Sequence, residues 1–160
     1  MSEHLDQLLV CAETTLEKLG TARDRVTAIA LDFGHNIGKI GRALTLHPEL
    51  APRVRAFVER TAERVRLEAR LSLWIHRVYD AAESRSSETD DYVRALAMRS
   101  DLEFLRDLYR DSVAGHYVAG IETDGTDQNL REWGAEQDLH DIPPGIPPSH
   151  VWWHHRRSGT

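Results

Sequence analysis

The stretch that decides the fold class is residues 3–45, which read EHLDQLLVCAETTLEKLGTARDRVTAIALDFGHNIGKIGRALT. Its apolar residues recur in steps of four and three, with one exception at Arg23, and this heptad pattern lasts for nearly six repeats. A strand would instead require alternation with a period of two. We therefore expect amphipathic helix with one buried stripe, made of Leu5, Leu9, Ala12, Leu16, Leu19, Val26, Ala30, Phe33, Ile37, Ile40 and Leu44.

The phase of this stripe continues through Gly20, which predicts one long helix or two collinear helices. An unbroken helix would be roughly 60 Å long at about 1.5 Å per residue. That length requires either an elongated bundle or a break near Gly20 or Gly34.

Glycines mark one flank of the stripe. Gly20, Gly34 and Gly41 share a heptad position, and Gly38 stands four residues after Gly34. Each glycine inside a helix costs about 1 kcal/mol relative to alanine. We expect this flank to be a surface of close approach, where a neighbouring helix packs. The alternative is a site where a ligand or a partner backbone comes close.

The middle of the chain also has helical patterning, in segments of about 48–83, 89–120 and 127–138. The apolar face changes along 48–83, which predicts a kink or a change of packing partner. Ser100–Glu103 matches a capping box and predicts a restart of the helix or a kink there. We therefore predict an all-α protein, in which residues 1–141 form an elongated antiparallel bundle of three to five helices.

The C-terminal segment 142–160, IPPGIPPSHVWWHHRRSGT, holds four of the six prolines and two of the four tryptophans. The prolines favour an extended polyproline II conformation before Ser149. The isoleucines and tryptophans are too apolar for a disordered linker, so we expect a proline-rich tail that packs on the bundle or on a partner. The candidate partner-binding residues are Pro143, Pro144, Ile146, Pro147, Pro148, Trp152 and Trp153.

Signals for metal binding and catalysis are weak. His150, His154 and His155 are close in sequence, but no carboxylate or cysteine accompanies them, so we expect no metal and no cofactor. A di-metal bundle would need Glu-x-x-His, and the nearest approach is Asp32-x-x-His35. A Gly-x-Ser-x-Gly motif is also missing from the sequence. A metal- or cofactor-binding bundle enzyme is therefore the alternative to a non-catalytic protein.

Arginines suggest a second alternative. Arg55, Arg66, Arg70 and Arg77 would lie within about 60° on one face of a continuous second helix. This stripe could bind phosphate or nucleic acid, or pair with the acidic segment 101–111. The net charge of −6 disfavours a nucleic-acid accessory protein.

Composition suggests a compartment and a class. The single cysteine, Cys11, excludes an intramolecular disulfide. No apolar run reaches the roughly 20 residues of a membrane span, and the polar N-terminus does not resemble a signal peptide. We expect a soluble, cytoplasmic binding or assembly protein that acts through its helix faces and tail. Its partner would be another protein or a second copy, which the heptad stripe could join as a coiled coil.

Overall fold

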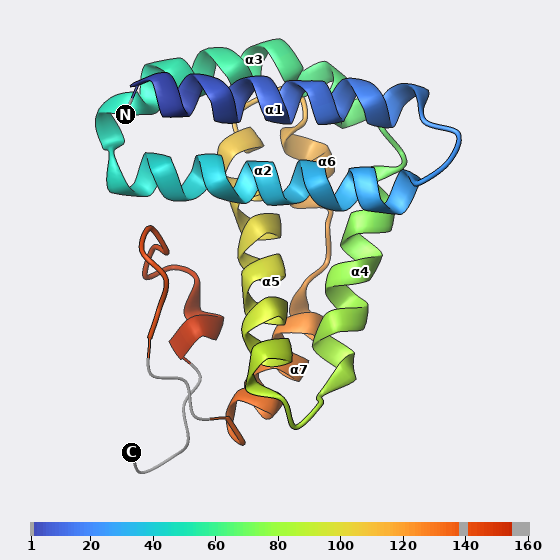
Figure 1. Cartoon of the computed structure of the whole chain (residues 1–160), viewed down its shortest axis with the longest axis vertical. Helices are drawn as coiled ribbons and strands as arrows, with labels where there is room; N and C mark the ends of the chain where they lie inside the picture. Colours follow the sequence, from blue (N-terminus) through green and yellow to red (C-terminus); the bar gives the residue numbers. More distant parts are fainter. Residues whose placement is uncertain (1, 138–140, 155–160) are drawn as a thin grey trace.

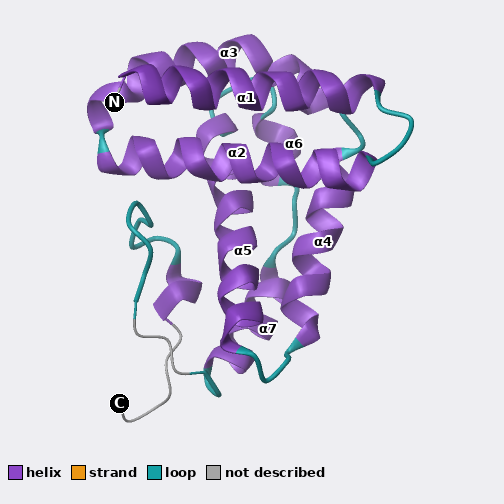
Figure 2. Cartoon of the chain, viewed as in Figure 1, coloured by secondary structure: helices purple, strands orange, loops and turns teal. Residues whose placement is uncertain are grey.

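The structure is a computed structural model that describes residues 2–137 and 141–154. The all-α prediction is confirmed for these residues, which contain no strand (Figure 1, Figure 2). The predicted number of three to five helices is wrong, because seven α-helices are present among them. They are α1 (Ser2–Thr21), α2 (Val26–Leu46), α3 (Ala51–Leu67), α4 (Leu71–Ser84), α5 (Thr89–Tyr109), α6 (Gly115–Ala119) and α7 (Asp124–Gly134), with short 3-10 helices η1 (Pro48–Leu50) and η2 (Val151–His154).

The heptad segment forms two antiparallel helices (Figure 1). The break follows Gly20, as one alternative predicted, and Arg25 takes a left-handed conformation with φ 53° just before α2. The prediction of collinear helices is wrong, because the chain reverses direction between Thr21 and Val26. The apolar stripes of α1 and α2 are buried in one core, so the seam predicted for self-association is occupied within the chain.

The second predicted helix is also two helices. α3 ends at Leu67 and α4 begins at Leu71. Between them, the Arg70 guanidinium donates to the carbonyl oxygens of Leu19 and Ala22 at 2.7 and 2.6 Å. These carbonyls lie at the end of α1, where helix acceptors lack intrahelical partners. The change of apolar face along the sequence thus corresponds to two helices with different neighbours.

The third predicted helix differs in two ways. α5 runs through Ser100–Glu103 without interruption, so the predicted restart of the helix is wrong. The Ser100 hydroxyl contacts the C-terminal segment and does not cap a helix. α5 ends at Tyr109, well before Gly120, and the separate helix α6 follows.

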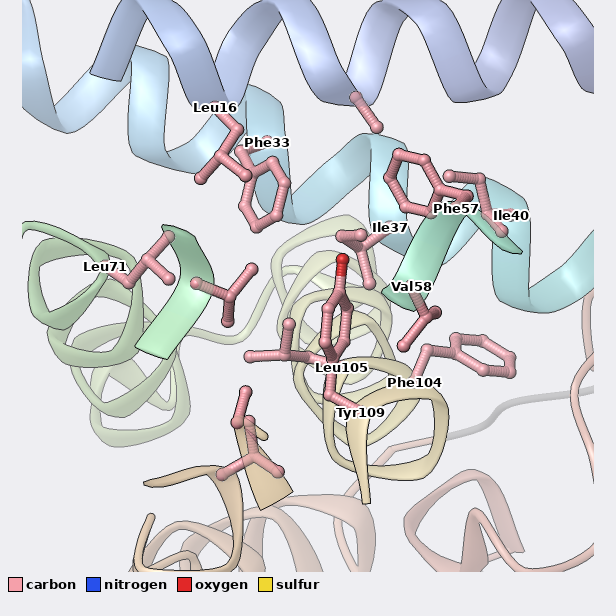
Figure 3. Close-up of a cluster of buried hydrophobic side chains, with 14 of the residues drawn as sticks. Leu16, Phe33, Ile37, Ile40, Phe57, Val58, Leu71, Phe104, Leu105 and Tyr109 are labelled. Carbon is pink, nitrogen blue, oxygen red and sulfur yellow. The ribbon is translucent and has the colours of Figure 1, made fainter. Parts of the chain in front are cut away.

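The helices do not form one antiparallel bundle. α1, α2 and α3 lie side by side as a layer, and α4 and α5 cross beneath it towards α7 (Figure 1). One hydrophobic core fills the layer and its junction with α5 (Figure 3). There, Tyr109 Oη and Thr61 Oγ1 are 2.6 Å apart. A second core joins α4, α5, α7 and the C-terminal segment, and includes Ala82, Tyr92, Ala95, Leu96, Leu130, Trp133, Trp152 and Trp153.

Three of the flank glycines lie where α2 crosses α4 and α5. A Cβ on Gly34 would overlap Trp74, one on Gly38 would overlap Asp101, and one on Gly41 would overlap Phe104. Gly20 is different, since its nearest neighbour would be Glu68 Oε2 at 3.7 Å, an ordinary contact. The glycine spacing therefore sets the crossing of α2 over two helices.

Candidate functional site

The C-terminal segment folds back along α5, and its tryptophans are buried there. Trp152 is 3% exposed and Trp153 is 1% exposed. The segment turns at Pro144–Gly145 and again at Pro148–Ser149 before η2, so the expected extended conformation is interrupted. Gly145 has φ 83°, the conformation that glycine adopts at the third position of a type II turn. A Cβ there would also lie 2.8 Å from the carbonyl oxygen of Arg42.

The hydroxyl of Ser100 on α5 is the common hydrogen-bond partner of both tryptophans. Its Oγ accepts hydrogen bonds from Trp152 Nε1 at 3.2 Å and Trp153 Nε1 at 2.7 Å. His150 Nδ1 lies 3.1 Å from the same oxygen. A serine hydroxyl has two acceptor lone pairs and one hydrogen. Because the indoles use both lone pairs, we assign the hydroxyl hydrogen to His150 Nδ1, which places the proton of the neutral imidazole on Nε2.

Aromatic rings and a guanidinium form a column across this site. The rings of Phe104 and His150 have centroids 4.5 Å apart, and those of His150 and Trp152 are 4.9 Å apart and stacked. The Arg99 guanidinium lies 4.0 Å from the Trp152 ring centroid. Phe104 and Arg99 both belong to α5. The rings of His150 and Trp152, which come from the C-terminal segment, therefore lie between two side chains of one helix.

Arg99 is a buried cation whose charge is compensated. It is 2% exposed. Nε and Nη2 donate to the two carboxylate oxygens of Asp127 at 2.6 and 3.2 Å, and Nη1 donates to Glu103 at 3.1 Å. Nη2 also donates to Thr123 Oγ1 at 3.2 Å. Asp127 lies in the first turn of α7, so Arg99 joins α5 and α7 beneath the Trp152 ring.

Ser100, His150 and Asp107 are the residue types of a nucleophilic triad, but their hydrogen bonds differ from those of a triad. His150 Nε2 lies 3.7 Å from Asp107 Oδ2, which is beyond hydrogen-bond distance, and has no hydrogen-bond partner within the described part of the chain. The lone pairs of Ser100 are directed at two indole N–H groups. This arrangement suits retention of a segment better than nucleophilic attack.

The candidate tail residues have different environments. Pro143, Ile146 and Trp153 line a cavity of about 60 Å³ together with Ser100. Pro147 is half-buried and its carbonyl accepts the His150 amide at 3.0 Å, whereas Pro148 is exposed. Pro144 borders a different hollow, beside α1 and α2.

The histidines proposed as weak metal ligands are not grouped with other ligands. His150 is buried and His154 is exposed at the end of η2, while His155 lies outside the described residues. Within residues 2–137 and 141–154, no three histidine, cysteine, aspartate or glutamate side chains are placed to hold a metal ion. Among the same residues, no helix is long and apolar enough to cross a bilayer.

The predicted arginine stripe is divided, because its helix is broken. Arg55 and Arg66 lie on α3, Arg70 lies in the link and Arg77 lies on α4. Arg66 pairs with Glu63, and Arg70 binds the end of α1.

Pairing of the stripe with segment 101–111 is limited. Arg55 approaches it, where it lines a cavity of about 240 Å³ with Asp107 and Asp111. Other arginines of α3 pair with α1 instead, as Arg60 and Arg64 do with Glu13.

Sequence reasoning missed the residues that hold the tail, Arg99, Ser100 and Asp127. A signal was available in Arg99 and Ser100, two adjacent polar residues between the apolar positions Leu96 and Leu102 of one helix. Because Ser100 also matches a capping box, the pattern favoured a helix start over a buried polar pair.

No family model, curated protein or solved structure matches the chain. The fold and the site define the class: an all-α protein with an aromatic segment bound against its own helices.

Proposed function

We propose that the protein is a non-catalytic binding and assembly protein. Its α5–α7 surface recognises a proline- and tryptophan-containing segment, and residues 142–154 of the same chain occupy that surface. The observation that carries the proposal is the Ser100 hydroxyl, whose three hydrogen-bonding positions are directed at Trp152, Trp153 and His150. The partner would be a second copy of the chain that exchanges this segment.

The chemistry of the site supports this reading. Tryptophan and arginine dominate the binding energy of many protein interfaces, and prolines reduce the entropy that a segment loses on docking. Here the Trp152 ring stacks against Arg99 of α5, and Trp153 donates a hydrogen bond to Ser100 of the same helix. The single cysteine Cys11 is exposed and has no disulfide partner among the described residues, which is compatible with a cytoplasmic location.

The alternatives receive less support. An enzyme that used Ser100 as its nucleophile would need an accessible hydroxyl, and the Ser100 hydroxyl is engaged by two indoles. A nucleic-acid accessory protein would need clustered arginines, and the four candidates are divided between α3, the link and α4.

A labelled peptide of residues 141–154 tests the proposal. The full chain or its W152A/W153A variant is titrated into the peptide, and binding is measured by the fluorescence anisotropy of the peptide label. The wild-type chain should bind the peptide weakly, because its own segment competes. The variant should bind it at least about tenfold more tightly, since the surface is then free.

Two further variants control this experiment. Adding S100A to the W152A/W153A chain should abolish its gain in peptide affinity. Adding S72A instead, at an exposed serine of α4, should leave that affinity unchanged. A W152A/W153A chain that keeps its helical circular dichroism but does not bind the peptide would contradict the proposal.

A further inference from the structure

A second feature lies on the other side of the C-terminal segment, where a hollow of about 500 Å³ opens between α1, α2 and the tail. This volume is within the range of small-molecule sites. The hollow combines basic and apolar side chains, and its lining residues are His4, Leu8, Lys39, Arg42, Ala43, Leu46, His47 and Pro144.

The cations of the hollow are available. Lys39 and Arg42 are half-buried on α2, and neither side chain makes a hydrogen bond or ion pair within the described part of the chain. None of the lining residues is an acid. At the rim of the hollow, His47 Nδ1 lies 3.5 Å from the exposed carboxylate of Glu49.

The acid beneath this part of α2 compensates the cations only partly. Asp101 packs against Gly38, and burial raises the pKa of its carboxyl well above the usual range, although Arg42 and Lys39 act in the opposite direction. His35 Nδ1 lies 4.0 Å from Asp101. Burial lowers the His35 pKa, and the charges of Lys39 and Arg42 lower it further, while Asp32 opposes them.

The apolar part of the hollow adds a second requirement. Leu8 lies on its α1 side, Leu46 is 52% exposed at its edge, and Pro144 closes it from the tail. A fully hydrated inorganic anion would leave these surfaces in contact with water. A ligand that carries both an anionic group and a hydrocarbon chain would satisfy the two cations and cover the apolar side chains.

We propose that this hollow binds a small amphiphilic anion, with a carboxylate or phosphate group at Lys39 and Arg42 and a hydrocarbon chain against Leu8, Leu46 and Pro144. This hollow adjoins the peptide site at Ser100, since Arg42 lines the cavities on both sides of the tail. Its ligand would hold Pro144 against α2, and so favour the docked tail.

The scarcity of lysine allows a direct test, because Lys18 and Lys39 are the only lysines of the chain. Reductive methylation with ¹³C-formaldehyde keeps their charge and gives each dimethyl-lysine its own NMR signal. Octanoate and octyl phosphate should shift the Lys39 signal saturably and leave the Lys18 signal in place. Octanol and octylamine, which lack the anionic group, should shift neither signal.

Variants check the assignment. R42Q should weaken octanoate and octyl phosphate binding about tenfold or more, since a hydrogen bond to a charged group is worth about 1.5–3 kcal/mol. R131Q, at an exposed arginine of α7, should leave affinity unchanged. Peptide binding by the W152A/W153A chain should survive K39Q, because Lys39 lines this hollow and not the cavity beside Ser100 and Trp153, so the two proposals fail separately.

Four outcomes would overturn the inference. The first is a parallel shift of both lysine signals, and the second is equal binding of octylamine. The third is binding of inorganic phosphate as tight as that of octyl phosphate, which would mean simple attraction of anions. The fourth is binding only to vesicles of anionic phospholipid, which would indicate a membrane surface and not a monomeric ligand.

Discussion

The guanidinium carbon of Arg99 lies 4.0 Å from the centroid of the Trp152 ring, and both side chains are nearly inaccessible to water. The same guanidinium forms a two-bond pair with Asp127 of α7. Arg99 therefore couples the docking of the C-terminal segment to the position of α7, because one cation contacts both.

Replacing Arg99 with methionine should destabilise the fold strongly. The carboxylate of Asp127, which is 31% exposed, would lose its two-bond partner, and the loss of a hydrogen bond to a charged group costs about 1.5–3 kcal/mol. R94M is the matched control on the same helix, since Arg94 is exposed and pairs with Asp91 only at 3.8 Å. Its cost should be within about 0.5 kcal/mol. Urea unfolding measures both, and equal midpoints for R99M and R94M would refute the role given to Arg99.

Replacing Ser100 with alanine should leave both indole N–H groups and His150 Nδ1 without their common partner. An unsatisfied buried polar group costs about 1–3 kcal/mol, so the unfolding free energy should fall by at least about 2 kcal/mol. The emission of Trp152 and Trp153 should also shift to longer wavelength. S72A, which removes an exposed hydroxyl, should do neither. An S100A chain as stable as S72A would show that the hydroxyl does not hold the segment.

Two glycine-to-alanine variants should have opposite effects. At Gly145, alanine meets the backbone of Arg42 and requires a left-handed φ, which should cost about 1–2 kcal/mol and loosen the tail. At Gly125 of α7 a Cβ meets no atom within 4 Å, so alanine should stabilise the helix by up to about 1 kcal/mol. Thermal unfolding compares them, and a neutral G145A would exclude the tight contact between tail and α2.

A second glycine pair tests the crossing of α2 over α5. G41A should cost about 1–3 kcal/mol, because the new methyl group overlaps the buried Phe104 ring. G20A should be neutral or stabilising by up to about 1 kcal/mol, since its nearest neighbour is an ordinary contact with Glu68. If the two variants unfold at the same denaturant concentration, the close approach is absent.

Tyr92 should make the protein sensitive to alkaline pH. Burial raises the pKa of its phenol to about 12, above its ordinary value near 10. The stabilising effect of the neutral phenol is complete below pH ~10 and is lost as pH rises towards ~12, because the unfolded chain releases its proton first. Urea unfolding between these pH values should show a falling stability.

The variant Y92F should reduce that fall. The Tyr92 hydroxyl is buried and has no hydrogen-bond partner within the described residues, so its loss at neutral pH should be neutral or stabilising by up to about 1 kcal/mol. Y109F is the contrast, since Tyr109 shares a hydrogen bond with Thr61 and its loss should destabilise. A Y92F chain that loses stability as Y109F does would contradict this interpretation.

Local patterns were enough to predict part of this structure. The heptad stripe and the glycine flank predict helices and a surface of close approach, because both depend on the 3.6-residue period alone. The same period conceals the break before Val26: the apolar phase continues across it, so an antiparallel pair and a collinear pair have the same pattern.

The candidate site depends on contacts that a local pattern cannot show. Ser100 lies in a sequence that matches a capping box, yet its partners are some fifty residues away in the chain. His150 resembles a metal ligand by its histidine neighbours, and its surroundings are a serine hydroxyl and two aromatic rings. Only the folding of the tail over α5 brings these groups together.

The most direct test of the central claim, that the α5–α7 surface recognises segment 142–154 and does so between copies, is a mixing experiment. A full-length S100A chain has an impaired surface and an intact segment, while a full-length W152A/W153A chain has the reverse. Neither should associate alone, and an equimolar mixture should form a one-to-one complex in light scattering, because one complete pair of surface and segment is restored. Two chains that remain monomeric after mixing, both folded by circular dichroism, would contradict the claim.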